Sequence, residues 1–168
     1  MKTNIELLNS SHIKSGFDCG HEMLNTYISK QASQDVKRDL SACYVLAYEE
    51  KKVIGYYTLS GNSIKRDEFP EELTRKLPQS YTDLPTVLLG RLAVSKDFKG
   101  QGLGEFILID ALNRCATLAE QVGTLAVLVE RIDKNAENFY ARYGFVKLTG
   151  SGKMFITIKT VRQSWPVI

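Results

Sequence analysis

The chain has 168 residues, of which 43% are apolar and 24% are charged, and its formal net charge is +3. This length predicts a single domain, residues 1–168, with one well-filled core. No apolar run approaches the roughly 20 residues of a membrane-spanning helix, and residues 1–10 lack the apolar region of a signal peptide, which predicts a soluble, cytoplasmic protein without membrane contact.

The first half of the chain predicts antiparallel strands and one long helix. Its expected elements are a strand at Asn4–Leu8, a helix from about Gly20 to Ser33, and two hairpin strands at Ala42–Tyr48 and Val53–Leu59. The hairpin strands are joined by the charged segment Glu49–Lys52. Helical spacing predicts that the helix buries one face, which comprises Met23, Leu24, Tyr27 and Ile28.

The middle of the chain, residues 61–85, contains three of the four prolines among many charges. We expect a long loop with one helical turn near Glu71–Lys76. Long loops in compact domains are more often functional than idle, so the segment Asn62–Pro85 is where substrate contacts are expected.

The second half alternates strands and helices. Its expected elements are strands at Thr86–Val94, Leu125–Val129, Phe145–Leu148 and Met154–Ile158, and helices at Gly102–Gln121 and Asn135–Tyr143. The first of these helices is apolar almost all round and is expected to be heavily buried. Hairpins followed by this alternation predict an α/β (α+β) fold with a mixed, twisted central sheet and helices on both faces.

Cysteine and histidine residues form no recognisable disulfide or metal-binding pattern. Cys19, Cys43 and Cys115 are odd in number, far apart and without a C-x-x-C pair, which argues against disulfides and against zinc. We expect Cys43 and Cys115 to be core residues, and Cys19 has no histidine placed by the sequence to activate it. His12 and His21 are predicted to be solvated, and no metal is expected.

The segment Val87–Gly104 has the layout of an anion-binding site, in which an apolar strand leads through a glycine-rich loop into a helix. Gly90 interrupts the strand, where a bulge would expose main-chain groups. Gly100, Gly102 and Gly104 allow the loop to turn tightly and to aim backbone N–H groups at a pyrophosphate. An ordinary strand-to-helix turn is the alternative. The loop fits neither a nucleoside-triphosphate loop nor a Rossmann fingerprint.

The loop Lys99–Gly104 resembles the acyl-CoA loop of GNAT-family N-acetyltransferases, with Lys99 where the family prefers Arg or Gln. The segment Asn135–Phe145 resembles a second element of that family, a helix that ends at a glycine and enters a strand. The resemblance implies a GNAT-like fold and acetyl-CoA as acetyl donor. The cofactor-binding residues expected from these segments and from the strand before the loop are Leu92, Ala93, Val94, Lys99, Gly100, Gln101, Gly102, Leu103, Gly104, Asn135 and Phe139.

Three further segments resemble the acetyltransferase toxins of type II toxin–antitoxin modules. They are Phe17–Gly20, Ile54–Leu59 and Arg91–Val94. Such toxins acetylate the α-amino group of aminoacyl-tRNA, so the resemblance implies aminoacyl-tRNA and a cognate antitoxin as partners, with a homodimer as a candidate assembly. A basic composition is compatible with an RNA partner, and a solvated mixed-charge surface explains it equally well.

Acetyl transfer to an amine needs a polarised thioester carbonyl and a proton for the departing thiolate. Backbone N–H groups at Leu92–Val94 are candidates for the first role. The resemblance implies that Tyr140 is the general acid, and a phenol is still protonated at neutral pH. For Phe139, packing in the hydrophobic core is the alternative to cofactor binding. Asp133 occupies a place where many relatives have Asn, so its contact to CoA is left open.

A strong general base is not evident in the sequence. An α-amino group with a pKa near 8 is partly neutral at cellular pH, whereas a lysine side chain is almost fully charged. This difference mildly favours an α-amino group as the acceptor. Glu130 is a candidate base through water, with a solvated strand end as the alternative. Acetylation of a small amine or a protein N-terminus, and a non-catalytic CoA- or nucleic-acid-binding module, are the competing functions.

Overall fold

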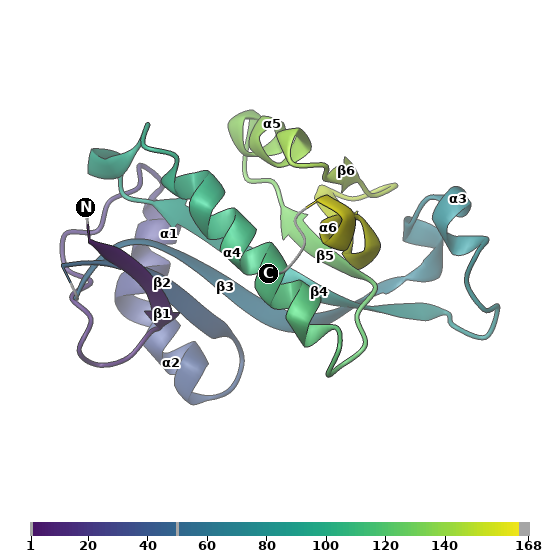
Figure 1. The fold of residues 1–168 in the computed structure, drawn as a ribbon, viewed down its shortest axis with the longest axis horizontal. Helices are drawn as coiled ribbons and strands as arrows, with labels where there is room; N and C mark the ends of the chain where they lie inside the picture. The colour runs from purple at the N-terminus through teal and green to yellow at the C-terminus, as the bar shows by residue number, and fades with distance from the viewer. Residues whose placement is uncertain (1, 50, 165–168) are drawn as a thin grey trace. The chain divides into compact units, whose positions relative to one another are not determined.

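The computed structural model describes residues 2–49 and 51–164. It contains a seven-stranded mixed sheet in the order β1-β2-β3-β4-β5-β7-β6, with β4 and β5 parallel (Figure 1). The strands are β1 (Thr3–Leu7), β2 (Ala42–Tyr48), β3 (Lys52–Lys65), β4 (Asp83–Val94), β5 (Ala126–Glu130), β6 (Val146–Lys147) and β7 (Lys153–Thr157). The helices are α1 (Glu22–Thr26), α2 (Ala32–Lys37), α3 (Glu71–Thr74), α4 (Leu103–Leu118), α5 (Lys134–Arg142) and α6 (Ile158–Ser164). The predicted α/β class with a mixed sheet is confirmed.

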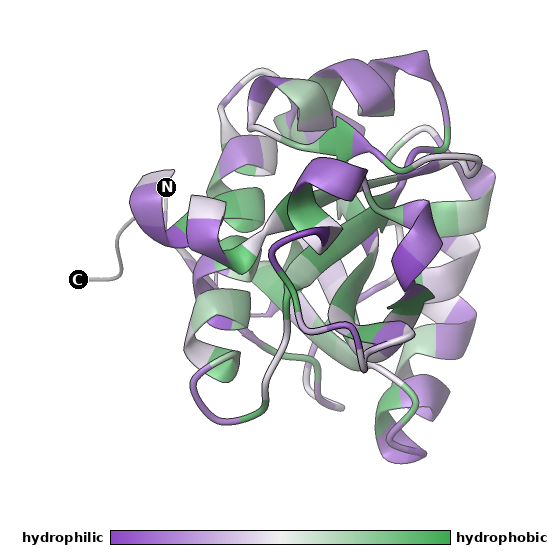
Figure 2. Ribbon diagram, turned by 90° about the vertical axis from the view of Figure 1, so that its right-hand side faces the viewer, coloured by the Kyte–Doolittle hydropathy of each residue, from purple (hydrophilic) through white to green (hydrophobic). Residues whose placement is uncertain are grey.

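The chain divides into two compact units, and three elements pass from one unit into the other. The first unit comprises Met1–Ser60 and Gly90–Ala111, and the second comprises Gly61–Leu89 and Leu112–Ile168. The strands β3 and β4 and the helix α4 belong in part to each. Figure 2 shows that the strands carry much of the hydrophobic sequence, whereas the helices alternate hydrophobic and hydrophilic positions.

In the first unit, β1, β2 and β3 pair antiparallel and present alternate residues to opposite faces of the sheet. One face packs against the helical segment that begins at α1, through a cluster that comprises Leu8, Phe17, Cys19, Leu24, Tyr27, Ile28, Ala32, Cys43, Val45, Val53, Tyr56 and Ala93. On the other face, Ile107 of α4 reaches to within 3.7 Å of the place where a Cβ of Gly55 would stand. Helices therefore cover both faces, as the sequence predicts.

The helix expected at residues 20–33 is wrong in detail. It consists of α1, a π-helical segment at Tyr27–Gln31 (η1) and α2, so it continues beyond Ser33. Leu24, Tyr27 and Ile28 are buried as predicted, but Met23 is 71% exposed. Successive helical residues are rotated by about 100°, and the buried stripe therefore holds Leu24 and leaves its neighbour Met23 in solvent.

In the second unit, β5 pairs antiparallel with β7, which pairs with β6. Residues 126–129 of β5 are fully buried, which fits a strand covered on both faces. A cluster in this unit comprises Ile64, Phe69, Leu84, Ala126, Leu128, Leu148 and Phe155. Cys43 in the first unit and Cys115 in the second are buried core residues as predicted, and Cys19 is buried as well.

The connection predicted as a loop over residues 61–85 is shorter than expected, because β3 extends to Lys65 and β4 begins at Asp83. The expected helical turn is confirmed as α3. The guanidinium of Arg66 donates to the carbonyls of Thr74 and Leu77 through one nitrogen and to those of Pro78 and Tyr81 through the other, at 2.6–3.1 Å. One side chain thus folds the connection on itself, which local propensity does not reveal.

Of the helices α4 and α6, only the first was predicted. α4 is heavily buried as predicted, although one of its apolar residues, Phe106, is 49% exposed. α6 was not predicted, and it buries Ile158 and Val161. In the part of the chain that the structure describes, no helix has the length and apolar character needed to cross a membrane.

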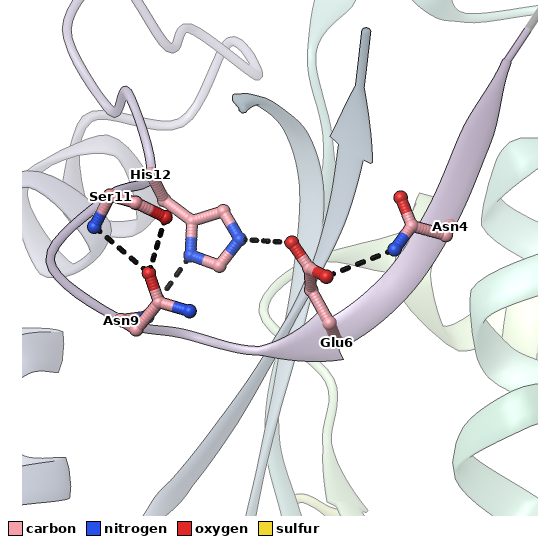
Figure 3. A network of polar contacts seen from close by, with 5 residues as sticks. All are labelled: Asn4, Glu6, Asn9, Ser11 and His12. Atoms are coloured by element: carbon pink, nitrogen blue, oxygen red, sulfur yellow. Dashed lines mark hydrogen bonds and ion pairs between the residues drawn. The ribbon is translucent and has the colours of Figure 1, made fainter. Parts of the chain in front are cut away.

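His12 is buried, which corrects the prediction that it is solvated. Its Nε2 lies 2.6 Å from Oε1 of Glu6 on β1, and its Nδ1 accepts the backbone N–H of Asn9 at 3.0 Å (Figure 3). The hydrogen bond with His12 lowers the pKa of Glu6. The histidine therefore joins β1 to the turn that follows it. The predicted connection Glu49–Lys52 includes Glu50, which lies outside the described residues.

Candidate functional site

A glycine-rich turn precedes α4 in the first unit. Gly100 and Gly102 have φ angles of 81° and 77°, a region that residues with a Cβ rarely adopt. A Cβ atom on either residue would meet no protein atom within 4 Å, so the turn is open on this side. α4 begins at Leu103, and the N–H of Phe106 donates to the carbonyl of Gly102 at 3.0 Å. The N–H groups of residues 103–105 lie at the helix start, where anions bind.

Two lysines tie this turn to the segment that precedes α1. Nζ of Lys99 donates to the carbonyl of Cys19 at 2.9 Å, and Nζ of Lys96 lies 2.9 Å from Oδ2 of Asp18. The backbone N–H of Lys96 also donates to the carbonyl of Asp18 at 2.8 Å. Lys99 was predicted to contact a pyrophosphate; one of the three N–H groups of its ammonium is used by Cys19.

Asp18 anchors the turn through both carboxylate oxygens. Its Oδ1 accepts the backbone N–H of Gly20 at 2.9 Å and Nδ2 of Asn25 at 3.0 Å. The hydrogen bond from Lys96, with smaller contributions from Gly20 and Asn25, lowers the pKa of Asp18 to about 2. The carboxylate is therefore ionised at neutral pH, and its charge holds the turn against the start of α1.

The segment Leu92–Val94, predicted to polarise a carbonyl group, ends β4. The parallel pairing of β4 with β5 extends to Leu89, the residue before the interrupting Gly90. Within the first unit, the carbonyl of Ala93 lies 3.2 Å from where a Cβ of Gly55 would stand. Gly55 thus permits the close approach of β3 and β4 at this point.

Tyr140 lies on α5 in the second unit and is 6% exposed. The ring centroids of Phe139 and Phe145 are each 5.3 Å from that of Tyr140. Burial raises the pKa of the Tyr140 hydroxyl because a phenolate would be poorly solvated there. The hydroxyl is therefore protonated at neutral pH. Phe139 is half-buried, between Tyr140 and Tyr143.

The start of α5 is capped by Asp133, whose Oδ1 accepts the N–H of Ala136 at 2.8 Å. Asp133 has the capping role typical of an Asp before a helix, which sequence reasoning missed although the signal was present. Asn135, a predicted cofactor-binding residue, is exposed in the first turn of the helix. Glu130, the candidate base, is exposed at the end of β5 and lies opposite Lys153 in the register with β7.

Glu137 is buried among three cations in the second unit. Its carboxylate pairs with Lys147 at 2.6 Å, Arg131 at 3.1 Å and Lys134 at 3.6 Å. The hydrogen bond from Lys147 is the largest of the contributions that lower the pKa of Glu137. This cluster joins α5 to β6 through Lys147 and to the residue after β5 through Arg131, and sequence reasoning missed it although Lys134 and Glu137 have i,i+3 spacing.

The structure groups the predicted site residues by unit. Leu92–Val94 and Lys99–Gly104 belong to the first unit, and Asn135, Phe139 and Tyr140 share α5 in the second. The anchoring role of Asp18 was missed, although an Asp two residues before a Gly is a turn signal. In residues 2–49 and 51–164, no three His, Cys, Asp or Glu side chains are grouped so as to hold a metal ion.

Comparison with known proteins identifies the family. Residues 40–147 match the model of the acetyltransferase (GNAT) domain. A tRNA-acetylating toxin from Mycobacterium tuberculosis is 32% identical over 131 residues, which cover 78% of this chain and 76% of the toxin.

Two solved structures are similar over nearly the whole chain. AtaT complexed with acetyl-methionyl-tRNAfMet has a TM-score of 0.90 and 30% identity, and the match covers 96% of this chain and 98% of that one. A tyrosine-to-phenylalanine mutant of AtaT, bound to the C-terminus of the antitoxin AtaR and to acetyl-CoA, has a TM-score of 0.83 and 26% identity, with coverage of 98% and 99%. The family match and the glycine turn before α4 lead to one conclusion: this chain belongs to the GNAT family of acetyltransferases.

Proposed function

We propose that this acetyltransferase moves the acetyl group of acetyl-CoA to the α-amino group of aminoacyl-tRNA and so acts as a translation-blocking toxin. The observation that carries the proposal is the 32% identity, over 78% of the chain, to a tRNA-acetylating toxin. The likeness to AtaT complexed with acetyl-methionyl-tRNAfMet supports the same acceptor.

Acetyl-CoA supplies an activated acetyl thioester, and the turn before α4 fits its pyrophosphate. The backbone at Gly100 and Gly102 faces open space on the side where a Cβ would stand, and the start of α4 offers unpaired N–H groups to an anion. We assign pyrophosphate binding to Lys99–Gly104. Asn135 and Phe139 are further candidate contacts to the donor, and the chemistry requires no metal.

Two groups of this chain have the chemistry that acetyl transfer needs. The N–H groups of Leu92–Val94 would polarise the thioester carbonyl, and one such donor typically contributes about 3–4 kcal/mol to the transition state. Tyr140 would protonate the departing thiolate. Its buried, protonated hydroxyl supports that role. The amine of an aminoacyl ester is neutral enough at cellular pH to attack without a strong base.

The proposed substrates place the reaction in the cytoplasm, and the proposed partner is an antitoxin. The AtaT structure with the C-terminus of AtaR supports an antitoxin for this chain. We also propose that residues 1–168 work as one catalytic domain, since β3, β4 and α4 each continue from one compact unit into the other. A homodimer is compatible with this proposal.

The direct test is transfer of labelled acetyl from acetyl-CoA to aminoacylated bulk tRNA, with deacylated tRNA as control. We expect label only on the aminoacylated RNA. Tyr140→Phe is expected to lower turnover by about 10²–10⁴-fold, the range typical of a lost general acid, while acetyl-CoA binding persists. Tyr143→Phe, a substitution of the residue that directly follows α5, is the matched control and should retain turnover.

The outcomes separate the competing functions. Label on small amines or protein N-termini, with none on RNA, would replace the tRNA acceptor. Tight acetyl-CoA binding without any transfer would favour a non-catalytic module. Equal turnover of Tyr140→Phe and wild type would remove the acid role from Tyr140.

A further inference from the structure

Arg91 on β4 holds its guanidinium over an aromatic ring but bonds to no other group. Its Cζ lies 3.6 Å from the ring centroid of Tyr27. Among the residues that the structure describes, the side chain of Arg91 forms no hydrogen bond or ion pair. A guanidinium has five N–H donors around its edge, and the stacking contact uses only its face. The edge of Arg91 is therefore available to an anion.

The ring beneath Arg91 is held rigidly. Tyr27 is 3% exposed, its hydroxyl donates to Oδ2 of Asp35 at 2.9 Å, and its ring stacks on Tyr56 with centroids 6.2 Å apart. The hydroxyl of Tyr56 in turn donates to the carbonyl of Leu24 at 2.7 Å. This packing fixes the plane of Tyr27 and, with it, the plane in which the Arg91 donors lie.

The helix under this stack is irregular at the same point. Tyr27 begins the π-helical segment η1, and π-helical turns are frequent at functional sites. Lys14 adds a second cation to this region: its Nζ donates to Ser33 at 2.9 Å. Burial raises the pKa of the Cys43 thiol, and the charges of Lys14 and Arg91 oppose that rise. The region thus combines two cations with the carboxylate of Asp35, which the Tyr27 hydroxyl already binds, and it is partly open because Arg91 is half-buried.

The position of Arg91 relates it to the acceptor. It directly precedes Leu92–Val94, the segment assigned to the acetyl carbonyl, and the attacking amine has to approach that carbonyl. In an aminoacyl-tRNA the carboxyl group of the amino acid is esterified, so the anions near the amine are phosphodiesters of the RNA. An arginine stacked on an aromatic ring presents a planar edge that suits bidentate contact with phosphate.

We propose that Arg91 binds a phosphate of the RNA portion of the acceptor and that Tyr27 is the positioning residue that fixes its orientation. This assignment rests on the proposed function. It makes Arg91 a determinant of preference for aminoacyl-tRNA over free amines, because a free amine lacks the phosphate.

The test compares Arg91→Met and Arg91→Lys with Arg162→Met, a control at an exposed arginine of α6. We expect Arg91→Met to raise the KM for aminoacylated bulk tRNA and the Kd for deacylated tRNA by about tenfold or more. The Kd for acetyl-CoA should not change. The KM and Kd of Arg91→Lys should fall between those of the wild type and Arg91→Met. In Arg91→Met, the steepness of the plot of log Kd against log salt should decrease by about 1.

Tyr27 provides a second readout, because the ring and the hydroxyl can be removed separately. Tyr27→Leu removes the ring and should raise the KM for aminoacyl-tRNA as Arg91→Met does. Tyr27→Phe keeps the ring, so its KM for aminoacyl-tRNA should be close to that of the wild type and well below that of Tyr27→Leu. A structural role of the tyrosine alone would change thermal stability and leave the KM unmoved.

Several results would overturn the assignment. If the wild type acetylates aminoacyl-tRNA and the KM of Arg91→Met is unchanged, Arg91 does not bind the RNA, and the proposed function still stands. The role of Arg91 would also be excluded if Arg162→Met lost as much affinity for tRNA. The same holds if Arg91→Met raised the KM equally for an amino-acid amide, which carries no phosphate. A wild type that acetylates no aminoacyl-tRNA would instead overturn the proposed function.

Discussion

Gly102 has a backbone requirement that a single substitution can test. Its φ of 77° is unfavourable for any residue with a Cβ, and the side on which a side chain would stand is open. Gly102→Glu adds bulk and a negative charge where the pyrophosphate is proposed to bind. We expect acetyl-CoA affinity to fall by a factor of about 100 or more, since repulsion adds to the loss of backbone contacts.

Gly102→Ala is the matched control for this change, because it introduces the backbone strain without the charge. Its loss of affinity, measured by calorimetry, should be much smaller than that of Gly102→Glu. Undiminished affinity in Gly102→Glu would exclude this turn from acetyl-CoA binding.

At the residue scale, what could be predicted depended on whether the signal was local. The glycines of the turn and Tyr140 stand in short motifs, and the sequence therefore predicts them as candidate site residues. Lys99 pairs with a carbonyl 80 residues away, and the ring that holds Arg91 lies on a separate helical segment. His12 was predicted to be solvated because its partner, Glu6, is visible only once β1 and the following turn are folded together.

At the scale of elements, the turn before α4 depends on the segment before α1. Asp18 forms an ion pair with Lys96 and accepts hydrogen bonds from Gly20 and Asn25. Asp18→Asn removes the charge that Lys96 needs while keeping an acceptor oxygen. We expect the KM for acetyl-CoA to rise several-fold with little change in kcat. The turn is proposed to bind the pyrophosphate and takes no direct part in acetyl transfer, so loosening it weakens binding only.

A double-mutant cycle with Lys96→Met checks this reading. If the two side chains act through their mutual pair, the double variant should be no worse than the worse single variant. Fully additive losses would show that each residue acts by itself. An unchanged KM in Asp18→Asn would mean that the anchor does not set the shape of the turn.

Most elements were predicted to within a few residues, since hydrophobic periodicity and turn residues are local properties. The differences occurred where tertiary contacts decide. Met23 has the spacing of a buried residue and is exposed, and Phe106 lies on an apolar helix and is half-exposed. The connection before β4 is shorter than expected because β3 extends to Lys65 and β4 begins at Asp83, and the side chain of Arg66 then binds four carbonyls within it.

For the whole molecule, three carboxylates should make stability depend on pH. Contacts with cations and hydrogen-bond donors lower the pKa of Glu6, Asp18 and Glu137 in the folded state. A carboxyl group whose pKa is lower in the folded state contributes its full stabilisation at pH values above its pKa in the unfolded state. That contribution is lost as the pH falls through its pKa in the folded state. For Asp18 the loss is expected between its ordinary value of 3.8 and about 2.

Urea unfolding at pH values between 2 and 7 measures this dependence. We expect the midpoint to be nearly constant above about pH 5 and to fall steadily below pH 4. Asp18→Asn removes one of the three carboxylates, so its midpoint should fall less over the same interval. A midpoint that rises on acidification would contradict the assigned pKa directions.

The sequence by itself determined the fold class, the family resemblance and the candidate chemistry of the glycine turn and Tyr140, because short-range spacing and side-chain type carry that information. The tertiary structure alone decided how Asp18 and two lysines hold the turn, how three cations surround Glu137, and how Tyr27 orients Arg91. The contacts of Asp18 and of Arg91 join segments far apart in the chain, and the contact between Lys147 and Glu137 depends on how α5 meets β6, so only packing brings these groups within hydrogen-bonding or stacking distance.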